Sequence, residues 1–199
     1  AYLAQQRFVD AIANLEIAHS IKPGTWETHK LLADLYMDQG MVKLALLNYE
    51  NALAANPNIP ADNALNPLRQ LIERSLYLEA AKYLYTLNTK LQSPLSQQLE
   101  IEKKVLTAQL EIQTDDPLKG LQQLEDILEI DPLNGKALLT VANYKMSQSV
   151  FPEAEFYFER ARSVDEFRVD ALIGLARITV QQGRFVQALG YLKEAQNIN

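Results

Sequence analysis

The 199-residue sequence has no cysteine and only two histidines, His19 and His29. Without cysteine, the chain has no disulfide, no thiolate metal site and no cysteine nucleophile. Two histidines cannot supply a site with several imidazole ligands, so we expect neither a metal nor a cofactor. Positive charge is scarce as well, because 19 Lys and Arg stand against 25 Asp and Glu and leave a net charge of −6. This balance argues against a nucleic-acid partner, which needs clustered positive charge.

The sequence also lacks an apolar run that approaches the roughly 20 residues of a membrane span, and it does not open on a basic and then apolar signal peptide. We therefore expect no membrane insertion by this segment. Apolar residues still make up 48% of the sequence, which is typical of a chain that folds around a hydrophobic core.

The sequence repeats itself with a period of 34 residues. A shift by one period places similar residues on one another near both ends of the chain. The matched pairs include Tyr2 with Tyr36, Ala11 with Ala45, Leu138 with Leu172, and Ala154 with Ala188. Such a period indicates one supersecondary unit that is stacked many times.

One period contains the pattern of two helices and a turn. In residues 26–59, apolar residues recur at three- and four-residue spacing on both sides of Asp38-Gln39-Gly40. Glycine after a polar stretch is typical of a helix end, and Asn56-Pro57 ends the second helix because proline cannot continue it. Small residues recur within the helices, where they allow helix axes to approach closely. They are Ala33, Ala142, Ala176, Ala11, Ala45, Ala154, Ala188, Ala18, Ala52, Ala161 and Ala195.

This unit resembles the tetratricopeptide repeat (TPR). Residues 26–59 supply most of the residues of the family pattern, although His29 stands where the family has an early tryptophan. The matching residues are Leu32, Ala33, Tyr36, Gly40, Ala45, Tyr49, Ala52 and Pro57. The resemblance implies an all-α fold, a right-handed α-solenoid of antiparallel helix pairs, and a single TPR solenoid over residues 1–199.

We divide the chain into 1–25 (a partial repeat), 26–59, 60–99, 100–134, 135–168 and 169–199. The segment 60–99 is a degenerate repeat: three prolines in Asn56–Pro67 predict a linker or extended loop, the first helix is short, and no glycine marks the turn. The sequence begins in the middle of a helix and neither end has a polar capping unit. We therefore expect the chain to be a fragment of a longer protein.

Residues that could carry chemistry have structural explanations. His19 is expected to complement a helix dipole, and His29 to be partly buried between helices. Asp115-Asp116 and Glu153 with Glu155 are interpreted as residues at helix starts. The aromatic run is interpreted as core; it comprises Phe151, Phe156, Tyr157 and Phe158. No nucleophile motif or phosphate loop occurs, so we expect no enzyme.

The family resemblance implies that a partner binds in a concave groove lined by the first helix of each repeat. The corresponding positions are Glu27, Lys30, Asp34, Met37, Asp38, Lys104, Lys136, Asn143, Met146, Asp170, Arg177 and Gln181. Some family members use such positions to clamp a terminal carboxylate. Here Asp34 replaces the asparagine of that clamp and would repel a carboxylate, so we do not expect the clamp.

We predict a non-enzymatic scaffold that binds a peptide or a segment of a partner protein. The Asp-Pro-Leu-Asn-Gly sequence at 131–135 is similar to bacterial TPR proteins associated with TonB-type transport, which implies an envelope or transport assembly in the periplasm, with the cytoplasm as the alternative. Other interpretations are an accessory or regulatory domain of a larger enzyme and an RNA-binding α-solenoid. The ends of the stack also permit a homo-oligomer.

Overall fold

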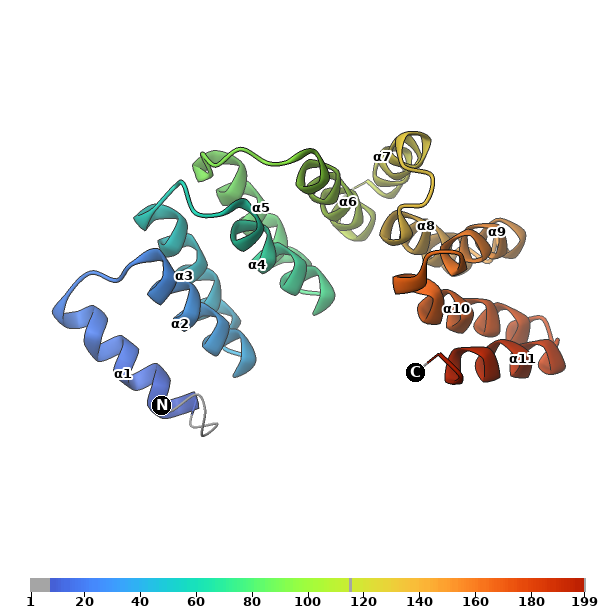
Figure 1. The fold of residues 1–199 in the computed structure, drawn as a ribbon, viewed down its shortest axis with the longest axis horizontal. Coiled ribbons are helices and arrows are strands. Elements are labelled where there is room, and N and C mark those ends of the chain that lie inside the picture. Colours follow the sequence, from blue (N-terminus) through green and yellow to red (C-terminus); the bar gives the residue numbers. More distant parts are fainter. Residues whose placement is uncertain (1–7, 115, 199) are drawn as a thin grey trace. The chain divides into compact units, whose positions relative to one another are not determined.

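A computed structural model describes residues 8–114 and 116–198, and within them the protein is all-α, with eleven α-helices and no strand (Figure 1). The helices are α1 Phe8–Ile21, α2 Trp26–Asp38, α3 Val42–Ala55, α4 Ala61–Glu73, α5 Tyr77–Lys90, α6 Gln97–Thr114, α7 Pro117–Ile130, α8 Gly135–Ser147, α9 Phe151–Arg162, α10 Arg168–Gln181 and α11 Phe185–Gln196. A short 3₁₀ helix, Asp165–Phe167, precedes α10. The predicted fold class, an α-solenoid of antiparallel helix pairs, is confirmed. The expected partial helix at Ala1-Tyr2 lies outside the described residues.

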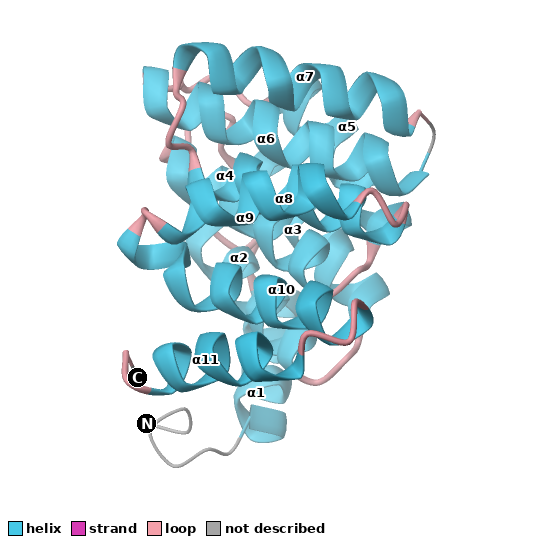
Figure 2. Ribbon diagram, turned by 90° about the vertical axis from the view of Figure 1, so that its right-hand side faces the viewer, coloured by secondary structure: helices cyan, strands magenta, loops and turns pink. Residues whose placement is uncertain are grey.

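The chain divides into two compact units, unit 1 (1–106) and unit 2 (107–199), and α6 runs from one into the other. In unit 1, α2 packs against α3 and α4 against α5, while α1 contacts α2. In unit 2, α8 pairs with α9 and α10 with α11, and α7 contacts α8. Short loops join the helices (Figure 2). We call α2, α4, α6, α8 and α10 the A helices, and α1, α3, α5, α7, α9 and α11 the B helices.

A small residue is the fourth residue of every B helix, and each of these residues is buried. They are Ala11, Ala45, Ala80, Gly120, Ala154 and Ala188. At Gly120 the fit is closest, because a Cβ atom there would lie 2.7 Å from the carbonyl oxygen of Ala108. The sequence period therefore has a packing cause: only a small side chain fits where a B helix crosses its neighbour.

The second residue after each of four A helices has a positive φ. Gly40 and Gly183 hold this place after α2 and α10, with φ of 71° and 73°, and Ser75 and Ser149 hold it after α4 and α8, with φ of 58° and 60°. Left-handed backbone costs a side-chain-bearing residue roughly 1–2 kcal/mol. The same turn follows four A helices, and its backbone is therefore strained where serine holds the position, at Ser75 and Ser149.

The prediction of a linker through Asn56–Pro67 and a short first helix after it is wrong. Helix α4 begins at Ala61 and has 13 residues, the same length as α2, with Pro67 inside it. Burial of Leu65, Leu68 and Leu71 outweighs the helix-breaking tendency of the proline. The second helix of this repeat, α5, begins at Tyr77.

The aromatic run at the start of α9 is only partly core. Phe158 is 1% exposed and lies against Gly174, whereas Phe156 is 58% exposed, so the prediction is wrong for Phe156. The two residues lie two positions apart and therefore point to different sides of the helix. The interpretation of Asp116 is confirmed, because its carboxylate accepts the backbone N–H of Lys119 at 3.1 Å and caps α7. Asp115 lies outside the described residues.

Candidate functional site

The predicted groove residues all lie on A helices. In unit 1, α2 carries Glu27, Lys30, Asp34, Met37 and Asp38, and α6 carries Lys104; in unit 2, α8 carries Lys136, Asn143 and Met146, and α10 carries Asp170, Arg177 and Gln181. Met37 is a correction, because its side chain is 0% exposed and belongs to the hydrophobic core. The family resemblance assigns a residue to the groove from its position in the 34-residue period. At the end of α2, however, the Met37 side chain packs inward, so no partner can reach it.

In unit 1, the charges at the centre of α2 are paired within the protein. The Lys30 ammonium lies 2.7 Å from the Asp34 carboxylate, one helical turn away. The phenol of Tyr49, from α3, donates a hydrogen bond to the other oxygen of Asp34 at 2.7 Å. Burial, and then the nearby Asp34 charge, raise the pKa of Tyr49, so this donor stays protonated. Asp34 is therefore occupied on both oxygens.

Two arginines of unit 1 were missed by the sequence analysis. Arg74 follows α4 and donates to the Met37 carbonyl at 2.8 Å and to the Asp38 carboxylate at 3.1 Å. Arg69, on α4, binds both oxygens of Glu102 at 2.6 and 2.8 Å and also Asp62 at 2.7 Å.

A signal for Arg69 was present in the sequence. It is the ninth residue of α4, as Asp34 is of α2, but the expectation of a loop left this repeat without groove residues. The hydrogen bonds to Glu102 are the largest cause that raises the pKa of Arg69, and they hold the guanidinium in a two-point contact. The A helices of unit 1 are thus joined to one another by ion pairs. Of the groove residues predicted in this unit, Glu27 and Lys104 have side chains that are exposed and unpaired within residues 8–106.

In unit 2 the predicted residues are arranged differently. Lys136 and Met146 are half-buried and the others are exposed. The five polar residues of this predicted set make no hydrogen bond and no ion pair through their side chains within the described part of unit 2: Lys136, Asn143, Asp170, Arg177 and Gln181. These groups are hydrated and available to a partner without the loss of an internal contact.

Four of these residues form two matched pairs. Asn143 on α8 and Arg177 on α10 are one 34-residue period apart, and so are Lys136 and Asp170. The two helices contact each other. Along each helix the pairs are separated by seven residues, which is two turns or about 10 Å. The result is a face with an amide and a guanidinium at one level and an ammonium and a carboxylate at the other. We call these four residues the α8–α10 face.

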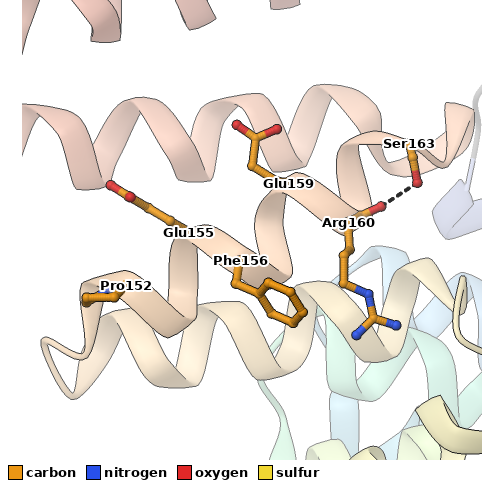
Figure 3. A pocket seen from close by; sticks show the side chains of 6 residues that line it. All are labelled: Pro152, Glu155, Phe156, Glu159, Arg160 and Ser163. Atoms are coloured by element: carbon orange, nitrogen blue, oxygen red, sulfur yellow. Dashed lines mark hydrogen bonds between the residues drawn. The ribbon is translucent and has the colours of Figure 1, made fainter.

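An open pocket in unit 2 is lined by one B helix, α9, and holds none of the predicted residues (Figure 3). Its lining residues are Pro152, Glu155, Phe156, Glu159, Arg160 and Ser163. The polar groups are already engaged: Arg184 binds Glu155, Arg160 donates to the Pro132 carbonyl at 2.6 Å, and Ser163 donates to the Arg160 carbonyl at 2.6 Å. The arrangement offers little to a ligand beyond the Phe156 ring.

No group of three or more His, Asp or Glu residues within the described part of the chain is placed to hold a metal ion. Among the helices of 8–114 and 116–198, none is both long and apolar enough to cross a bilayer.

No protein-family model and no curated protein matches this sequence. Solved structures do match. A tetratricopeptide repeat protein from Parabacteroides merdae aligns over 100% of this chain and 76% of its own, with a TM-score of 0.70 and 18% identity. The C-terminal part of a TPR repeat-containing protein from Cytophaga hutchinsonii aligns over 100% and 81%, with a TM-score of 0.61 and 14% identity. The pilF protein of Pseudomonas aeruginosa aligns over 96% and 83%, with a TM-score of 0.59 and 20% identity. Together with the paired helices, the small residues at their crossings and the shared turns, these likenesses establish that the chain has the fold of tetratricopeptide repeat proteins.

Proposed function

We propose that this protein is a non-enzymatic scaffold that binds an extended segment of another polypeptide on the α8–α10 face. The observation that carries the proposal is the contrast between the A helices of the two units. In unit 1 the central charges are bound to one another, whereas in unit 2 Asn143, Arg177, Asp170 and Lys136 have no partner among the described residues. A surface with free donors and acceptors binds a peptide without first breaking internal ion pairs.

The chemistry of the face fits a peptide backbone and one charged side chain of each sign. Asn143 offers both a donor and an acceptor, which is what an extended backbone presents in alternation. Arg177 offers a fork of donors for a carbonyl or carboxylate group. At the other level, Asp170 accepts from a basic side chain and Lys136 donates to an acidic one. The half-buried Met146 on α8 adds an adaptable apolar contact.

Binding measurements on an array of short peptides, followed by calorimetry with the best binder, test this proposal. Arg177→Ala and Asn143→Ala each remove a hydrogen-bonding group and should weaken binding about tenfold or more. Lys193→Ala, on the exposed side of α11, is the matched control and should leave the affinity unchanged. If Arg177→Ala and Asn143→Ala bind as the parent does, or if Lys30→Ala and Asp34→Ala weaken binding instead, the face is not the binding site.

We propose further that the scaffold serves a bacterial envelope or transport assembly in the periplasm. The support is the Asp-Pro-Leu-Asn-Gly sequence, whose residues form the turn between α7 and α8. Asn134 caps α8 by accepting the backbone N–H of Ala137 at 3.1 Å and also donates to Asp131 at 3.1 Å. This turn chemistry alone favours such a sequence, so the compartment needs its own test. Cell fractionation of the full-length protein should place it with periplasmic markers, and recovery with cytoplasmic markers alone would reject the proposal. Sizing in solution tests whether copies of the chain also associate with one another.

A further inference from the structure

The two histidine rings of the chain are in contact where α1 meets α2. His19 is in the last turn of α1 and His29 is in the first turns of α2; their ring centroids are 4.5 Å apart and their planes are inclined by 53°. Both side chains are half-buried, as predicted for His29. Gly24, in the connection, lies directly against the His19 ring, because a Cβ atom there would be 2.4 Å from Nε2. The imidazoles are therefore packed into the joint between the helices.

Hydrogen bonds assign one proton to each ring. The Thr28 hydroxyl donates to the Thr25 carbonyl at 3.0 Å, so its oxygen accepts from Nε2–H of His19 at 2.9 Å. The Asn48 amide donates to the Leu44 carbonyl at 2.9 Å, which turns its oxygen toward His29, and that oxygen accepts from Nδ1–H at 3.3 Å. Each neutral ring thus donates one hydrogen bond. The other nitrogen, Nδ1 of His19 and Nε2 of His29, can take a second proton.

Within residues 8–198, α1 buries few side chains. Ala11 and Ile12 are its buried residues, and Tyr36 of α2 donates a hydrogen bond to Glu16. The apolar side chains of Val9, Ile17 and Ile21 are exposed. A helix with so few buried side chains opens at a lower cost than the core helices, and the histidine pair is one of its contacts with α2.

The charged groups around the pair do not offset a second positive charge. On α1, Glu16 accepts from Tyr36; on α2, Lys30 pairs with Asp34; and α3 presents the neutral amide of Asn48. Burial, and then the neighbouring His29, lower the pKa of His19 below its usual value. His19 does lie in the last turn of α1, as expected, but burial and the second ring act against its positive charge there.

We propose that the contacting His19–His29 pair is a pH-sensitive joint, and that charging both rings releases α1 from α2. The sign follows from linkage. His19 takes up its proton more readily once the joint has opened, so the joint is stable above the ordinary histidine pKa of about 6.5 and weakens as the pH falls below it. This pH range is the one in which histidine switches act in other proteins.

Hydrogen exchange of the full chain measures the release directly. Expressed as protection factors, which remove the intrinsic pH dependence of exchange, the amides of α1 should lose about tenfold or more of their protection between about pH 7.5 and about pH 5. The amides of α3, which holds no histidine, should keep theirs. Trp26, the single tryptophan of the chain, lies two residues from Gly24 and reports the same opening by its fluorescence.

Variants separate the histidine joint from other acid-sensitive contacts. His29→Phe keeps a ring against His19 but carries no charge, so it removes the repulsion between the two rings and leaves only the burial of His19, and the pH dependence of the protection of α1 should become smaller than in the parent. His29→Gln serves the same purpose if the phenylalanine variant does not fold. Glu16→Gln removes the carboxylate that accepts from Tyr36 and should lower protection at every pH while keeping its pH dependence. Protection that does not change with pH in the parent, or a pH dependence that is undiminished in His29→Phe and disappears in Glu16→Gln, would overturn the proposal.

Discussion

The two units are built from the same helix pairs, yet they differ in how they use the polar residues at the centre of their A helices. In unit 1, Arg69 ties α4 to α6 through Glu102, and Arg74, directly after α4, ties it to α2 through Asp38. In unit 2, the residues at corresponding positions, such as Asn143 and Arg177, are exposed and unpaired among the described residues. The same repeat position therefore serves stability in one place and is free for recognition in the other. The fold does not fix that choice.

The largest expected effect on stability distinguishes an inner B helix from a terminal one. Phe158 and Leu192 are one period apart, but Phe158 is 1% exposed beneath α10 and Leu192 is 46% exposed. Phe158→Ala should lower the free energy of unfolding by about 3–5 kcal/mol because it leaves a cavity. Leu192→Ala should cost less than about 1 kcal/mol. Thermal or urea unfolding measures both, and equal costs would mean that the neighbouring helices do not cover the two sites differently.

The next effect concerns the small residues at the helix crossings. Ala45→Leu in unit 1 and Ala188→Leu in unit 2 should each cost about 1–3 kcal/mol through overpacking, with the smaller cost at Ala188. The reason is that α11 has exposed neighbours such as Leu189 and can shift outward, whereas Ala45 is fully enclosed. Urea unfolding gives the two values. Variants as stable as the parent would contradict the packing role of this position.

A third prediction tests the different use of charge in the two units. Arg69→Ala removes the partner of Glu102 and Asp62 and should cost about 1–2 kcal/mol, because both carboxylates lose a charge-assisted hydrogen bond near the surface. Arg177→Ala should stay within about 0.5 kcal/mol of the parent, because no internal contact is lost. Unfolding at low and high salt should show the Arg69 effect shrinking as salt rises. A stability loss at Arg177 as large as that at Arg69 would remove the contrast between the units.

The smallest effect compares the strained turns with the relaxed ones. Ser75→Gly and Ser149→Gly should each stabilise the protein by about 0.5–1 kcal/mol, because glycine adopts the positive φ without a steric cost. Gly40→Ser and Gly183→Ser should destabilise it by a similar amount. Melting temperatures of the four variants suffice. A rise for either serine introduced at Gly40 or Gly183 would contradict the conformational explanation.

The fold could be predicted because its signals are local and repeated. The three- and four-residue spacing of Leu32, Leu35 and Tyr36 and the glycine at the turn describe one helix and its end, and the 34-residue period supplies the rest. The same reasoning failed around Pro67, because the prolines were given more weight than the helical spacing of the apolar residues beside them. The site was predicted in part: the A helices do carry the residues, but Met37 is buried, and Arg69 and Arg74 were absent from the prediction.

The sequence by itself determined the helix pairs, the turns between them and the small residues at their crossings, because each of these depends on neighbours within a few residues or at one fixed period. Only the tertiary structure decided which charges are neutralised and which stay free. Arg69 reaches Glu102 from 33 positions away, and His19 meets His29 across a bend in the chain. Such contacts depend on the rotation of one helix against the next, and the order of residues along a single helix does not specify that rotation.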